Sequence, residues 1–77
     1  MERITGTTTA HTILQNIRVD WSVDEDGTVT ANGETAGRIV ESLSTVVYAF
    51  PADGHNWETS FSSAVNAAAA LAARHVA

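Results

Sequence analysis

The sequence predicts a single α+β domain in which a small antiparallel sheet of four or five strands packs against one C-terminal helix at about 62–75. Apolar and polar residues alternate over 13–23, which is the period of a half-buried strand. Turn signals such as Asn32-Gly33 separate further short runs of β-branched residues, as expected for antiparallel hairpins. The chain ends in an alanine-rich run behind a pair of serines, which indicates a capped helix.

The chain has 77 residues and no cysteine. A chain of this length forms one small domain whose limited core favours self-association as an added source of stability. The absence of cysteine excludes disulfides and thiolate metal sites. Residues 1–12 are threonine-rich without a clear period, so we expect a loose N-terminal arm there and a single α+β domain over 13–77.

The first strand is expected to begin at Ile13, because the odd positions from there are apolar and the even positions polar. An acidic turn follows at 24–27. The next strand is expected to point Val29 and Ala31 inward and to end at the Asn32-Gly33 turn. The inward residues of the first strand are expected to be Ile13, Ile17, Val19, Trp21 and Val23.

Residues 34–43 are compatible with two structures. Their apolar residues have the spacing of an amphipathic helix, but Gly37 in the interior disfavours one. Alternatively, "GRIVES" pairs as a strand with the following "TVVYAF". We favour the strand and keep a short helix as the alternative. The helical spacing is carried by Ala36, Ile39, Val40 and Leu43.

The segment "TVVYAF" is the most strongly predicted strand, because it is β-branched and aromatic. A turn at Asp53-Gly54 follows, and we expect Trp57 and Phe61 to share one face, with Trp57 in the core between sheet and helix. Ser62 or Ser63 then caps the helix. Its core stripe is expected to be Val65, Ala68, Leu71, Ala72 and Val76.

The segment "GRIVES…VVYAFPADGHNWETSFSSAVNAAAALAA" resembles small strand–strand–strand–helix modules common in actinobacteria and their phages. It is also similar in outline to the N-terminal DNA-binding domain of tyrosine integrases and to plant AP2 domains. The aromatic strand, the Asp-Gly turn, the aromatic before the serine cap and the alanine helix carry the resemblance, over about half of the chain. In those two families the sheet carries basic and aromatic residues into the major groove. The resemblance therefore implies DNA binding through Arg18 and Arg38 on one exposed face.

Charge disfavours this alternative. The chain has four arginines, no lysine, nine acidic residues and a net charge of −5, whereas nucleic-acid binding usually requires a basic patch. The longest apolar run, "AAAALAA", is too short to cross a membrane, and because the first residues lack a basic leader with a continuous apolar core, we expect no export signal. We expect a cytoplasmic protein, in the host cytoplasm if it is encoded by a phage.

Catalysis and metal binding have little support in the sequence. We find no nucleophile elbow, glycine-rich phosphate loop or His-Glu-x-x-His motif, and we predict no enzyme activity, catalytic residue, metal site or cofactor. The stretch "SVDEDGTVTANGE" departs from a calcium loop because Gly33 stands where the last ligand belongs. A weaker alternative is metal or small-ligand binding by the 51–57 loop. Its candidate residues are Asp53, His55, Asn56 and Trp57.

Two features favour protein–protein interaction. Carboxylates are expected to gather at one end of the first hairpin, where they would attract a basic partner. The outer helix face is mostly alanine where charge is usual, so a second copy is able to approach it closely. We therefore expect a non-enzymatic accessory or regulatory protein that docks through the acidic hairpin or an exposed sheet face, as a homodimer. The candidate residues are Asp20, Asp24, Glu25, Asp26, Ala69, Ala70, Ala73 and Arg74.

Overall fold

The computed structural model describes residues 3–42, 46–54 and 60–77, which form six strands and one helix. Each strand pairs antiparallel with the next, so the sheet is a meander. The predicted α+β class is confirmed, with six strands instead of four or five. The elements are β1 (Ile4–His11), β2 (Asn16–Val23), β3 (Thr28–Ala31), β4 (Glu34–Glu41), β5 (Val47–Pro51), β6 (Ser60–Phe61) and α1 (Ala64–Val76).

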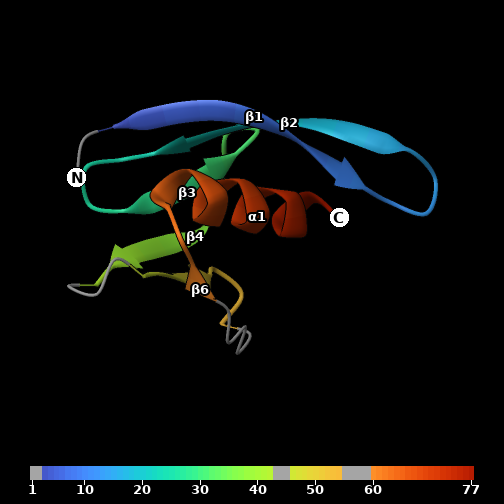
Figure 1. Cartoon of the computed structure of the whole chain (residues 1–77). Coiled ribbons are helices and arrows are strands. Elements are labelled where there is room, and N and C mark those ends of the chain that lie inside the picture. Colours follow the sequence, from blue (N-terminus) through green and yellow to red (C-terminus); the bar gives the residue numbers. More distant parts are fainter. Residues whose placement is uncertain (1–2, 43–45, 55–59) are drawn as a thin grey trace.

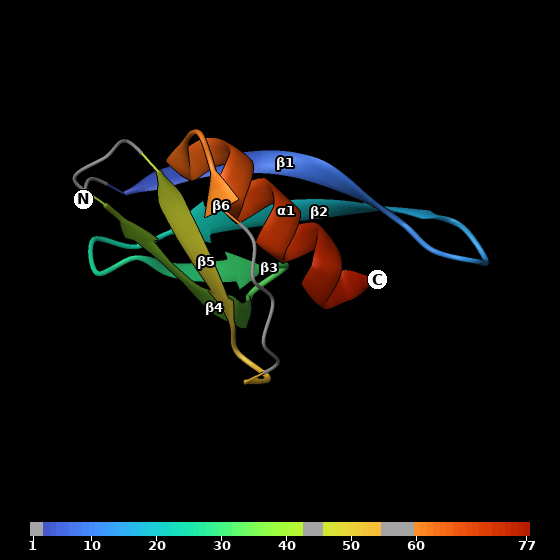
Figure 2. The same cartoon turned by 60° about the horizontal axis from the view of Figure 1, so that its bottom comes forward.

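The sheet curls around the helix. In Figure 1, β1, β2 and β3 lie on one side of α1 and β4 and β6 on the other, and Figure 2 shows β5 running beside β4. The helix contacts all six strands. Strands that approach from several sides require small side chains on the helix, and three of its four buried residues are alanine, namely Ala67, Ala68 and Ala72, with Leu71 the fourth.

The core confirms the inward faces predicted for β2 and β3. Val19, Val23 and Val29 are fully buried and Trp21 is 4% exposed. Gly6 lies opposite Trp21 in the register, and a Cβ atom at Gly6 would stand 2.4 Å from Cζ2 of the indole. A glycine at this position of β1 is therefore what allows the tryptophan ring to lie flat against the strand.

The predicted loose arm at 1–12 is wrong, because Ile4–His11 is a regular strand. All eight of its residues pair with β2. Its inward positions are Ile4, Gly6, Thr8 and Ala10. All of these except Ile4 are small or polar, so the segment shows little hydrophobic alternation. The first predicted strand also begins later than expected, at Asn16 instead of Ile13.

Residues 34–41 form a strand, so the favoured prediction for this segment is confirmed and the alternative helix is wrong. A β-bulge forms where Val29 pairs with Gly37 but Thr30 pairs with Thr35. The extra residue, Ala36, shifts the alternation, so that Ala36 and Gly37 are both buried. The bulge therefore accounts for the helix-like spacing of Ala36 and Ile39, whereas Val40, which shares that spacing, is 40% exposed on the other face.

The helix begins at Ala64, with Ser63 as its N-cap. The Ser63 hydroxyl accepts a hydrogen bond from the Asn66 backbone N–H at 3.1 Å, so the predicted cap is confirmed. The predicted core stripe is wrong at Val65, which is 51% exposed, while Ala67 is fully buried. Four consecutive alanines at 67–70 provide no hydrophobic contrast from which the buried face could be assigned.

Candidate protein-interaction surfaces

Exposed apolar side chains gather on the outer face of β4 and β5, away from the helix. Val40 lies opposite Tyr48, and Arg38 lies opposite Phe50. Alternate residues of a strand share a face, so these four side chains form one surface. Val40 is 40%, Tyr48 45% and Phe50 54% exposed. We call these four residues the β4–β5 patch, and its aromatic content is typical of protein interfaces.

The turn between β2 and β3 lies directly beside this patch. The Gly27 carbonyl accepts a hydrogen bond from the Ile39 N–H at 2.9 Å, which extends the pairing of β4 along the turn. Asp24, Glu25 and Asp26 are all exposed there, and we call these three residues the acidic turn. The acidic turn and the β4–β5 patch therefore form one continuous surface.

Hydrogen bonds within the turn favour the ionised form of the Asp26 carboxylate. Its carboxylate accepts a hydrogen bond from the Thr28 backbone N–H at 3.0 Å. Hydrogen bonds from the Thr28 backbone and hydroxyl, with a smaller contribution from the charge of Arg38, lower the pKa of Asp26 below its ordinary value of 3.8. The carboxylate is therefore ionised at neutral pH, and the influence of the Arg38 charge on it places that arginine near the acidic turn.

Asp20 does not belong to the acidic turn, contrary to the prediction. It lies opposite Thr7 in the middle of β2, and four residues of strand separate it from Asp24 by about 13 Å. Its carboxylate forms an ion pair with Arg18, with Arg18 Nε at 3.3 Å from Asp20 Oδ1. Asp20 therefore belongs to a local ion pair with Arg18 within β2, away from the acidic turn.

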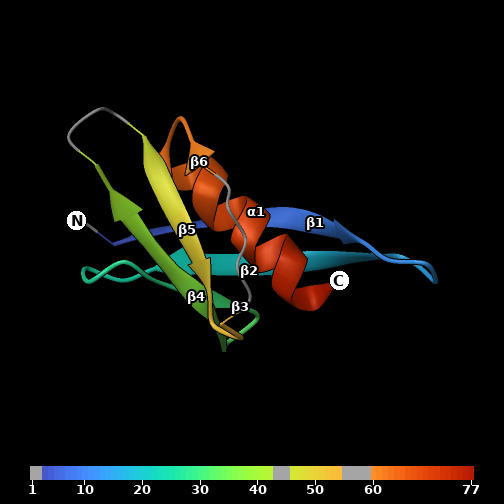
Figure 3. The same ribbon diagram turned by 90° about the horizontal axis from the view of Figure 1, so that it is seen from below.

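The hairpin of β1 and β2 extends beyond the C-terminal end of α1, as Figure 3 shows. The strand β3 pairs only with Trp21–Val23 of β2. Pairing stops at Asn32, whose side-chain oxygen accepts from the Asp20 N–H at 2.9 Å and whose own N–H donates to the Asp20 carbonyl at 2.8 Å. Residues 10–17, which we call the hairpin arm, consequently have no third strand beside them among the described residues.

The tip of the hairpin arm is apolar and fully exposed. Ile13 is 103% and Leu14 93% exposed. The tip is ordered by Thr12, whose N–H donates to the Gln15 carbonyl at 3.0 Å and whose hydroxyl accepts from the Gln15 N–H at 3.1 Å. These bonds fix the turn with both apolar side chains in solvent. The expectation that Ile13 faces the core is therefore wrong.

The two arginines implied by the DNA resemblance both lie on the outer face of the sheet but not together. Arg18 lies beside the hairpin arm and is paired with Asp20, whereas Arg38 lies opposite Thr28 at the other end of the sheet. Arg38 is close to the ionised Asp26. A phosphate backbone approaching either arginine would also meet a carboxylate, which weakens the electrostatic attraction.

The alanine face of the helix is less open than the sequence suggests. Ala69 and Ala73 are half-buried and pack against the core, and Ala70 is also half-buried. Arg74 Nη1 lies 3.3 Å from Asp53 Oδ2, which joins the end of α1 to the turn after β5. This pair gives Asp53 a structural role.

The other residues of the 51–57 loop candidate, His55, Asn56 and Trp57, lie outside the described residues, as does the predicted contact of Trp57 with Phe61. In the described ranges, no three His, Asp or Glu side chains are grouped as metal ligands. No helix in the described part of the chain has the length and apolarity to cross a lipid bilayer.

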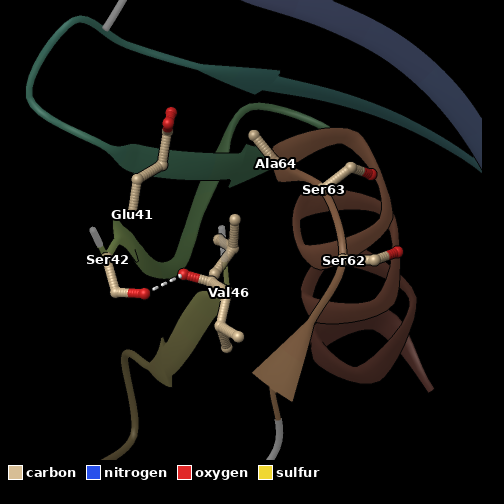
Figure 4. A pocket seen from close by; sticks show the side chains of 7 residues that line it. Glu41, Ser42, Val46, Ser62, Ser63 and Ala64 are labelled. Atoms are coloured by element: carbon tan, nitrogen blue, oxygen red, sulfur yellow. Dashed lines mark hydrogen bonds between the residues drawn. The ribbon is translucent and has the colours of Figure 1, made fainter. Parts of the chain in front are cut away.

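An open cleft of about 330 Å³ lies where the end of β4 meets the start of α1 (Figure 4). Two of its hydroxyl groups bind the backbone, and Ser62 Oγ accepts a hydrogen bond from Asn66 Nδ2 at 3.5 Å. Ser42 Oγ donates to the Val46 carbonyl at 2.8 Å, and Ser63 is the N-cap of the helix. In Figure 4 the Ser62 and Ser63 side chains point away from Glu41 and Ser42. The Ser63 hydroxyl of the cleft is therefore used to cap the helix, and the Ser42 hydroxyl to bind the Val46 carbonyl.

Sequence reasoning missed the β4–β5 patch and the arm tip. The signal for the patch is that "TVVYAF" is apolar at both parities, so one face of the strand is apolar without being needed by the core. The signal for the tip is the apolar pair Ile13-Leu14 between two polar residues. Comparison of the chain with protein-family models, curated proteins and solved structures finds no match.

Proposed function

We propose that this chain is a cytoplasmic, non-enzymatic accessory or regulatory protein that docks a basic partner protein on its outer sheet face. The observation that carries this proposal is the cluster of Val40, Tyr48 and Phe50 on the side of the sheet opposite the helix. Exposed aromatic residues contribute disproportionately to binding energy at interfaces. The acidic turn beside them indicates the charge of the partner.

The two parts of the surface have separate roles. The acidic turn attracts a basic segment and raises the rate of association. The rings of Tyr48 and Phe50 then provide the contact area, because arginine and lysine side chains pack their apolar stems and their charge against aromatic faces. This combination favours a partner segment that carries both basic and apolar residues.

A labelled peptide with alternating arginine and leucine residues, followed by fluorescence anisotropy, tests the proposal. The double substitution Tyr48→Ser and Phe50→Ser is expected to weaken binding about tenfold or more. The matched control, Thr7→Ser with Thr9→Ser on the outer face of β1, is expected to bind as the unmodified chain does. Circular dichroism establishes that each variant is folded.

Two further comparisons separate charge from contact. Asp24→Asn with Glu25→Gln is expected to slow association and reduce its salt dependence, and it leaves the Asp26–Thr28 hydrogen bond intact. A peptide with glutamine in place of arginine is expected to bind more weakly than the basic one. Equal binding of both peptides, or undiminished binding by the Tyr48→Ser, Phe50→Ser variant, would contradict the proposal.

A further inference from the structure

The strand β1 forms one edge of the sheet and, among the described elements, contacts only β2 and α1. Edge strands in soluble proteins are usually protected by shortness, charge, proline or a bulge. The opposite edge strand, β6, has two residues. By contrast β1 has eight residues, lacks proline and carboxylates, and pairs with β2 without irregularity. Its outer edge is therefore suited to pair with a further strand.

The distribution of charge indicates which strand that is. The sequence from Arg3 to Arg18 contains no acidic residue, although the whole chain carries nine and has a net charge of −5. Two copies of an acidic chain repel one another wherever their carboxylates meet. A second copy that approaches β1 and the hairpin arm therefore meets no carboxylate from these segments, whereas a basic partner is drawn instead to the acidic turn. Residues 60–77 also lack acidic residues, but α1 is partly covered by the sheet.

We infer that two copies of this chain pair edge to edge through antiparallel β1 strands, so that one sheet runs through both. This interface is separate from the β4–β5 patch and does not depend on the proposed docking function. It is isologous, the arrangement usual for homodimers. We therefore assign self-association to the β1 edge instead of the alanine face of α1, which the sheet partly covers.

The alternation of β1 limits the register of this pairing. Thr5, Thr7 and Thr9 are exposed on the outer face, while Thr8 is half-buried on the inner one. Directly opposed residues in an antiparallel pair share a face, so residues of equal parity must be opposed. The two-fold registers closest to the middle of β1 place Thr7 opposite Thr7 of the second copy, or Thr8 opposite Thr8.

In either register the hairpin arm runs past the beginning of the other β1 strand. In the Thr8 register, Ile4 of one copy is opposed to Thr12 of the other, so the exposed Ile13 and Leu14 come next to the Ile4 end of the second copy. In the Thr7 register, Ile4 is opposed to Ala10, and the tip lies about 10 Å beyond it. Ile4 is partly buried against the core cluster, so the contact extends apolar surface that is already present. Pairing in the Thr8 register thus gives a contact to the two fully exposed apolar side chains that the ordered turn holds away from the body of the domain.

Sedimentation velocity tests the dimer, with an expected mass of twice 8.1 kDa. Thr7→Lys places two ammonium groups close to the two-fold axis, directly opposed in the Thr7 register and diagonal in the Thr8 register. It is expected to yield a monomer, because like charges across a strand pair are destabilising. In the Thr8 register, Ile13→Ser with Leu14→Ser is expected to raise the dimer dissociation constant about tenfold or more. The matched control Thr35→Lys, on the outer face of β4, is expected to remain a dimer. A monomeric unmodified chain, or a Thr7→Lys variant that dimerises normally, would overturn the inference.

Cysteine cross-linking identifies the strand, because the chain has no cysteine of its own. Oxidation is expected to link Thr7→Cys in the first register or Thr8→Cys in the second, since opposed Cβ atoms are close enough for a disulfide. Thr35→Cys is the control expected to stay unlinked. A dimer in which neither β1 variant cross-links would overturn the pairing. The Tyr48→Ser, Phe50→Ser variant is expected to lose the basic peptide and keep the dimer mass, so the two proposals fail separately.

Discussion

Replacing Ala68 by leucine tests whether the curled sheet requires alanine in α1. Ala68 is fully buried and belongs to a helix contacted by all six strands, so the added carbon atoms have no space. Leucine has nearly the helix propensity of alanine, which leaves helix formation almost unchanged. Adding methylene groups to a well-packed core typically costs about 1–3 kcal/mol, and we expect a loss of stability in that range for Ala68→Leu.

The loss is large for a domain of this size. A chain of 77 residues is expected to have a free energy of unfolding of about 4–12 kcal/mol. Each kcal/mol lowers the Tm of so small a domain by about 4–8 °C, so the predicted decrease is about 4–24 °C. Thermal and urea denaturation followed by circular dichroism measure it.

The control substitution is Ala70→Leu, at a half-buried position outside the core cluster. We expect it to change the free energy of unfolding by no more than about 0.5 kcal/mol. If Ala68→Leu is tolerated as well as Ala70→Leu, close approach of the sheet does not require alanine. Helix propensity alone would then account for the alanine run.

Three further substitutions test local features of the fold by urea denaturation. Gly37→Ala is expected to lower the free energy of unfolding by about 1 kcal/mol or more beyond the effect of Gly54→Ala. The reason is steric, because a Cβ at Gly37 would stand 2.3 Å from the Phe50 carbonyl oxygen, whereas Gly54 borders open space. Equal effects of the two substitutions would contradict this reason. Ser63→Ala is expected to lower the free energy of unfolding by about 1 kcal/mol through loss of the N-cap, and Ser62→Ala is expected to lower it by less. A larger loss for Ser62→Ala would refute the assignment of Ser63 as the N-cap. Asp26 contributes stability above its ordinary pKa of 3.8 that is lost as pH falls through its lowered folded pKa. Asp26→Asn is therefore expected to reduce the stability lost in acid, and an unchanged profile from pH 6 to 2 would contradict this.

The sequence predicts the fold best where polar and apolar residues contrast. In β2 the alternation of Val19, Trp21 and Val23 with polar residues gives the correct buried face. In β1 the inward positions include Gly6 and Thr8, so the strand is recognised only through its pairing with β2. The information that makes this segment a strand thus resides in its partner strand, which a local pattern does not contain.

The candidate site was predictable in part. The acidic turn follows from Asp24, Glu25 and Asp26 in the sequence, but their position beside Arg38 depends on the pairing of Gly27 with Ile39. Asp20 has the same charge and lies only four residues away, yet strand geometry separates it from the turn. Whether Tyr48 and Phe50 face the helix or the solvent depends on which face of β5 the helix covers, and packing across the whole sheet determines this.

The most direct test of the proposed function is NMR mapping of backbone amide shifts in the isotopically labelled chain during titration with the arginine–leucine peptide. We expect the largest shifts in the acidic turn and at the four residues of the β4–β5 patch, with β1 little changed. Shifts concentrated on β1 or on the cleft at the start of α1, with the β4–β5 patch unperturbed, would contradict the proposed function.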